Sequence, residues 1–225
     1  MRRVPLVPLI SFAAWMAAAG YAEAQDAHRV YVGALFGVST LSGDARSVTT
    51  VSAANASMYK PENGAALDLF AGAHLARFVS LQANYIFNRN DLTLFASSTS
   101  PAAFYEQPRQ SAQHAFVADL LLYFRNRQSR IRPYLGTGLA VVHFRSPAVT
   151  GGLIHGITPP AGDIESTNVG LRSHVGLDVG LGRRWSLRYS FSETIGGNPI
   201  SPHLTPMGER GLANFQNLFG LLMHF

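Results

Sequence analysis

The sequence contains no cysteine among its 225 residues. This absence excludes structural disulfides and any lipid anchor carried on a cysteine. Lysine is nearly absent too, since Lys60 is the only one in the chain. Charged residues make up 14% of the sequence, whereas soluble domains contain roughly 25%. The chain is therefore poor in charge for a soluble protein.

Long hydrophobic runs are missing beyond the first 24 residues, where no segment reaches the roughly 18 apolar residues expected of a membrane-spanning helix. Hydrophobic residues still form 47% of the chain, so they must follow a shorter pattern. The formal net charge of the chain is +5. However, the sequence contains no basic helix and no cluster of arginines interleaved with aromatic residues, which nucleic-acid-binding proteins use. We therefore expect no nucleic-acid partner.

The N-terminal segment has the three-part layout of a secretory signal peptide. It begins with the basic letters MRR, continues through an apolar stretch and closes on the small-residue pattern AEA. An uncleaved anchor is the alternative, because the stretch approaches the ~20 residues that span a bilayer. The prolines and the AEA ending favour cleavage. We predict a signal peptide over residues 1–24 and a mature domain over residues 25–225.

The mature chain alternates between apolar and polar residues with a period of two, which is typical of β-strands. In VSLQANYIFN, residues 79–88, one face carries Val, Leu, Ala, Tyr and Phe, and the other is mostly Ser, Gln and Asn. In each such segment one face is aliphatic or aromatic, while the other is small and polar. Seven further segments fit this template: residues 29–39, 65–75, 114–124, 132–142, 171–182, 185–192 and 214–225.

Eight such segments, each about 10–12 residues long, match the strands that cross a bilayer at a tilt. A sheet can span lipid only when it is closed, since every backbone donor and acceptor must be paired internally. A soluble sandwich also alternates, but its outward face is polar, whereas the uniform face here is apolar. We therefore predict an all-β fold, an eight-stranded antiparallel up-and-down transmembrane β-barrel.

The connections between these segments alternate between short and long. In outer-membrane barrels the short turns are periplasmic and the long loops are extracellular. We expect the arginines of the short turns to be solvated charge rather than a partner site. Aromatic residues near strand ends, among them Phe124, Phe144 and Trp185, are candidates for the interfacial girdles. The short connections are residues 76–78, 125–130 and 182–184, and the four long ones are about residues 41–63, 90–112, 145–167 and 193–211.

The polar faces also carry acids and bases that would point into the barrel. An unpaired buried charge costs several kcal/mol, so we expect these groups to pair. A turn at residues 182–184 places Asp178 directly opposite Arg188 across the strand ladder. An eight-stranded barrel is only wide enough for side chains to fill it, so the sequence predicts a plugged lumen without steady conductance. The predicted lumen charge network is Asp68, Asp119, Arg132, Arg172, Asp178 and Arg188.

Three stretches carry a resemblance to a known family: IRPYLGTGLAV at residues 131–141, RFVSLQANY at residues 77–85, and the final strand. They resemble the OmpA-like outer-membrane β-barrels of Gram-negative bacteria, the small eight-stranded type. The resemblance implies a barrel in outer-membrane lipid. It also implies that the outer-membrane assembly machinery reads the C-terminal strand as a signal. The residues of that signal are Phe219, Leu221, Met223 and Phe225.

Function follows less directly, because this barrel supports several roles. We expect a non-enzymatic structural or surface-exposed protein of the outer membrane. Three alternatives remain open: an adhesin whose long loops bind an unknown extracellular partner, a narrow pore, and a lipid-modifying enzyme.

The sequence offers little for catalysis or cofactors. Related lipid A deacylases use a His-x-Ser-Asn strand element, but His174 is followed by Val and Gly, and Ser192 has no neighbouring histidine. The histidines lack metal-site spacing, and GLDVGLG at residues 176–182 lacks the spacing of a phosphate loop. We predict no catalytic, cofactor-binding or metal-binding residues.

Overall fold

The computed structural model describes residues 29–41, 46–48, 56–61, 63–99, 102–148, 163–200 and 211–225. The predicted signal peptide at residues 1–24 lies outside the described residues. No helix in the described part of the chain is long and apolar enough to cross a membrane. The strands are β1 (Val30–Leu41), β2 (Arg46–Val48), β3 (Ala56–Pro61), β4 (Gly64–His74), β5 (Val79–Thr99), β6 (Ala102–Tyr123), β7 (Ile131–Ser146), β8 (Ile164–Gly180), β9 (Trp185–Gly197) and β10 (Gly211–His224).

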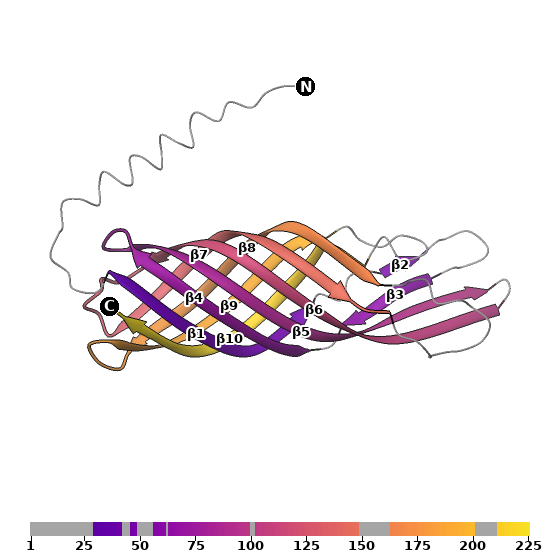
Figure 1. The fold of residues 1–225 in the computed structure, drawn as a ribbon, viewed down its shortest axis with the longest axis horizontal. Helices are drawn as coiled ribbons and strands as arrows, with labels where there is room; N and C mark the ends of the chain where they lie inside the picture. Colours follow the sequence, from indigo (N-terminus) through magenta and orange to yellow (C-terminus); the bar gives the residue numbers. More distant parts are fainter. Residues whose placement is uncertain are drawn as a thin grey trace, which may run out of the picture.

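Eight of these strands close into one barrel (Figure 1). Going round the barrel, the order is β1, β4, β5, β6, β7, β8, β9 and β10, and β10 pairs with β1 to close it. Every pairing is antiparallel. The predicted eight-stranded antiparallel barrel is confirmed.

The period-two alternation sorts the side chains between the outside of the barrel and its interior, the lumen. Large apolar residues stand on the outer face, where Phe36, Phe116 and Val169 are 69%, 65% and 70% exposed. Charged residues are buried inside, where Asp68 and Arg172 are each 1% exposed. This arrangement is the reverse of a soluble protein and matches an outer surface that contacts lipid.

Three short turns lie at one end of the barrel, which is called the short-turn end. They cover residues 75–78, 124–130 and 181–184, and the chain also ends there (Figure 1). In the last of them the Leu181 amide donates to the Trp185 carbonyl at 2.9 Å. The three predicted short connections are thereby confirmed, and the register of the neighbouring strands follows from them.

The predicted long connections are wrong in two places. Residues 90–112 were expected to form a loop, but β5 and β6 pair continuously as far as Thr99 and Ala102. Residues 41–63 include β2 and β3, and β3 pairs with the outer part of β5. Backbone hydrogen bonds can continue beyond the bilayer, where no buried face imposes apolar alternation, so the pattern there carried no signal.

Phe144 is a second correction. It was a candidate for the outer aromatic girdle, but its side chain is 2% exposed, near Gln113 and Asn214 at the end of the lumen opposite the short turns. The reason is parity. Phe144 lies an even number of residues from the buried Arg132 on β7, so it points to the same side.

Candidate functional site

The most distinctive feature of the lumen is its charge. All six predicted lumen residues are buried in the barrel interior. They come from five strands, β4, β6, β7, β8 and β9, which closure of the barrel brings around a common interior. The residues are Asp68, Asp119, Arg132, Arg172, Asp178 and Arg188.

Asp178 on β8 and Arg188 on β9 form a two-pronged ion pair. They are direct partners in the ladder, in the register that the short turn predicted. Arg188 Nε donates to Asp178 Oδ1 at 2.6 Å, and Arg188 Nη2 donates to Asp178 Oδ2 at 2.8 Å. The Tyr123 hydroxyl adds a third hydrogen bond to Asp178, at 3.0 Å. Two parallel hydrogen bonds of this kind set the relative orientation of the two side chains and also neutralise their charges.

Aromatic rings surround the guanidinium of Arg188. Its central carbon lies 4.9 Å from the ring centres of Phe70 and Tyr134, and 5.6 Å from that of Tyr31. Such cation–π contacts stabilise a desolvated arginine. The rings come from β4, β7 and β1 respectively. Sequence reasoning missed them because no local pattern links the three strands.

Arg172 on β8 neutralises two acids at once. Its Nη1 donates to Asp119 Oδ2 at 2.8 Å, and its Nη2 donates to Asp68 Oδ2 at 3.3 Å. The charges are therefore not three one-to-one pairs. Within the described residues Arg132 forms no ion pair, and its guanidinium lies 3.9 Å from the ring centre of Tyr123 instead.

Two amides on β5 connect these charged groups. Arg188 Nη1 donates to Gln82 Oε1 at 2.7 Å, and Gln82 Nε2 donates to Asn84 Oδ1 at 2.6 Å. Asn84 Nδ2 then donates to Asp119 Oδ2 at 2.7 Å. The alternation placed both amides on the polar face, but nothing in the sequence marked them as bridges. The chain of contacts through Asp178, Arg188, Gln82, Asn84, Asp119, Arg172 and Asp68 is called the lumen network below.

A histidine, a serine and an acid also meet in the lumen. His174 is the ladder partner of Ser192, and His174 Nε2 lies 3.6 Å from Asp119 Oδ2. However, neither ring nitrogen of His174 has a hydrogen-bond partner in the described structure, and the Ser192 hydroxyl donates to Gln216 at 2.9 Å. No group of three or more potential metal ligands occurs among the described residues.

The predicted assembly-signal residues Phe219, Leu221, Met223 and Phe225 are all at least partly exposed, at alternate positions along the end of the chain. β10 closes the barrel against β1, with Leu221 opposite Ala34, and the Phe225 amide donates to the Val30 carbonyl at 2.8 Å. Recognition of this strand by the assembly machinery stays a prediction.

A closed barrel with an apolar outer face and a polar interior defines a small outer-membrane β-barrel protein. The family model described as the outer membrane protein beta-barrel domain matches residues 6–209, so the chain belongs to this family. The predicted family resemblance and outer-membrane location are thereby confirmed.

Solved structures support the same fold. The chain is similar to Neisserial surface protein A, with 16% identity, a TM-score of 0.54, and coverage of 89% of this chain and 100% of that one. It is also similar to OprG from Pseudomonas aeruginosa, with 11% identity, a TM-score of 0.57, and coverage of 89% and 97%. No curated protein matches the sequence. Identities this low relate the folds alone.

Proposed function

We propose that this protein is a non-enzymatic barrel with a structural or surface-exposed role, and that its lumen is plugged by charged residues. The observation that supports this proposal is the lumen network, which links Asp178 to Asp68 through an unbroken series of contacts. The groups that it joins come from β8, β9, β5, β6 and β4, so the network crosses the interior. A barrel of eight strands leaves room for little more than its own side chains.

The geometry around His174 also favours a non-enzymatic role. Nucleophilic catalysis needs a base within hydrogen-bond reach of the hydroxyl, and a third group that orients the base. Ser192 Oγ instead donates to Gln216, and it accepts a hydrogen bond from Arg172 Nη2 at 3.4 Å. Ser192 is 1% exposed. Its hydroxyl is therefore part of the hydrogen bonding inside the lumen.

Conductance tests the proposed plug. We expect purified wild-type protein in a planar lipid bilayer to give no steady channel current, because the lumen network crosses an interior that is narrow in a barrel of eight strands. Insertion is checked in parallel by the heat-dependent gel shift of the folded barrel. The double variant Asp178→Ala/Arg188→Ala removes both members of one pair and serves as the comparison, with more frequent openings expected. A stable open channel from the wild-type protein would contradict the plug.

A second candidate function is recognition of an extracellular partner by the end of the barrel opposite the short turns. The paired ends of β5 and β6 run past the rest of the barrel, and β3 and β2 extend this sheet (Figure 1). In barrels of this class the end opposite the short turns is extracellular. A paired sheet beyond the membrane holds its outer residues in fixed positions, which suits a binding surface.

Shortening this hairpin separates the two candidates. Thr93 and Pro108 face each other across the ladder, so an Asn-Gly turn can replace residues 94–107. We expect the shortened barrel to keep its heat-dependent gel shift, because the removed segment lies outside the closed eight-stranded part. Binding of both proteins, in fluorescent lipid vesicles, is compared on arrays of extracellular-matrix proteins and glycans. Equal binding by both would exclude recognition through this hairpin.

A further inference from the structure

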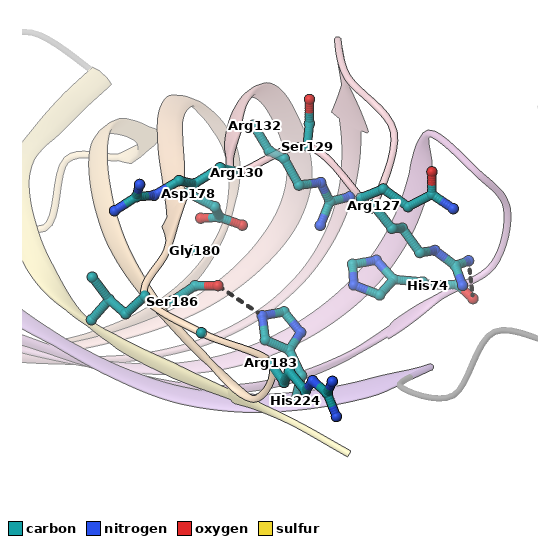
Figure 2. Close-up of a pocket in the computed structure, with 13 residues that line it drawn as sticks. His74, Arg127, Ser129, Arg130, Arg132, Asp178, Gly180, Arg183, Ser186 and His224 are labelled. Carbon is teal, nitrogen blue, oxygen red and sulfur yellow. Dashed lines mark hydrogen bonds between the residues drawn. The ribbon is translucent and has the colours of Figure 1, made fainter.

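A cavity of about 630 Å³ opens at the short-turn end of the barrel (Figure 2). Its walls come from the ends of β4 and β8, the turn at 124–130, the start of β7, the turn at 181–184, and β9 and β10. The volume lies within the range of about 300–1,000 Å³ that is common for small-molecule sites. The residues that carry the argument are His74, Arg127, Arg130, Arg132, Arg183 and Ser186.

The lining of this cavity is strongly cationic. Four arginines contribute to it, and Asp178 is the one carboxylate among the described residues that line it. That carboxylate is already bonded by Arg188 and Tyr123. A concave wall with a surplus of one charge raises the local concentration of the opposite ion, so the cavity favours an anion.

Arg132 gives the cavity a buried donor without a protein acceptor. Its side chain is 6% exposed, and its Nε and Nη2 have no hydrogen-bond partner in the described structure. The contact with the Tyr123 ring, at 3.9 Å, holds the guanidinium in place but accepts no conventional hydrogen bond. Leaving a buried charged donor unsatisfied is costly. An oxyanion in the cavity would satisfy it.

Hydrogen bonds within the protein position other donors that line the cavity. Arg127 Nη2 donates to the carbonyl of Ala76 at 3.0 Å, which ties the 124–130 turn to the neighbouring turn. The Ser186 hydroxyl lies 3.1 Å from His224 Nε2 (Figure 2). Hydroxyl, imidazole and guanidinium groups together are the usual ligands of a phosphate.

We propose that this cavity binds a phosphate-bearing anion. Several guanidinium groups around one opening suit a group with several charged oxygens better than they suit a single carboxylate. The short-turn end is periplasmic in barrels of this class, so the phosphate could come from a lipid headgroup of the inner leaflet or from a free periplasmic compound. The proposal does not depend on whether the lumen conducts.

Two pairs of arginines in the same turns provide the test. Arg130 and Arg183 line the cavity, whereas their neighbours Arg125 and Arg184 do not, and all four are exposed. The variant Arg130→Gln/Arg183→Gln and the control Arg125→Gln/Arg184→Gln therefore remove the same charge from the same two turns. Inorganic pyrophosphate is titrated calorimetrically into each refolded protein in zwitterionic detergent. A heat-dependent gel shift first verifies that each barrel is folded.

We expect saturable binding of one pyrophosphate to the wild type, about tenfold weaker binding to Arg130→Gln/Arg183→Gln, and less than a twofold change in the control. A short-chain phosphatidic acid is titrated in the same way. Saturable, cavity-dependent binding of either probe supports the site, and the tighter probe identifies the source of the phosphate. Equal weakening in both double variants, or no saturable binding of either probe, would overturn the proposal.

Discussion

Arg172→Met is expected to cause the largest loss of stability of any single substitution in the lumen. Methionine keeps the apolar stem of the side chain but lacks the guanidinium, so it leaves Asp68 and Asp119 buried together without the cation that both contact at present. Removing one partner from a buried ionic group destabilises a protein by about 3–5 kcal/mol. The effect is measured as the free energy of unfolding in urea. The protein is unfolded in lipid vesicles, and the heat-dependent gel shift reports the fraction that is still folded. The loss is expected to appear also as a lower yield of folded barrel.

Two further variants show that charge causes the loss. Adding Asp68→Asn and Asp119→Asn to Arg172→Met removes the orphaned carboxylates, so a large part of the lost stability is expected to return. Arg145→Met changes an exposed arginine at the end of the barrel opposite the short turns, and it is expected to have little effect on the free energy of unfolding. Should Arg172→Met alone unfold at the wild-type urea concentration, the lumen network would not stabilise the barrel.

Gly176→Ala is expected to have the second largest effect, although it adds only one carbon. A Cβ at this position would overlap the ring and hydroxyl of Tyr134. Tyr134 is buried and contributes one of the rings around Arg188, so moving it would disturb the cation as well. Forcing extra volume into a packed interior costs about 1–3 kcal/mol, and we expect the upper end here. Urea unfolding in lipid vesicles again provides the measurement.

Another glycine on the same segment provides the control. Gly182 lies in the short turn, and an added Cβ there would meet no atom within 4 Å. Gly182→Ala is therefore expected to leave stability nearly unchanged. Replacing Tyr134 by leucine in the Gly176→Ala background should restore part of the loss, because the overlapping ring is gone. Equal stability of Gly176→Ala and Gly182→Ala would contradict the packing argument.

The alternation in the sequence determined which side chains face lipid and which face the lumen. This inference succeeds because successive side chains of a strand must point to opposite faces. One local feature also set a specific contact. The short turn at 182–184 leaves only a few residues between β8 and β9, so the pairing of Asp178 with Arg188 could be predicted from counting along the chain.

The tertiary structure decided which distant groups meet. Arg172 lies 104 positions from Asp68 and 53 from Asp119, and counting along the chain cannot align strands that far apart. The alignment depends on how the strands are staggered when the barrel closes. The same closure gathers the rings around Arg188, leaves Arg132 without an ion pair among the described residues, and forms the cationic cavity from separate turns. The alternation specifies only the face of a residue, whereas closure of the barrel specifies its height along the lumen and its neighbours across it.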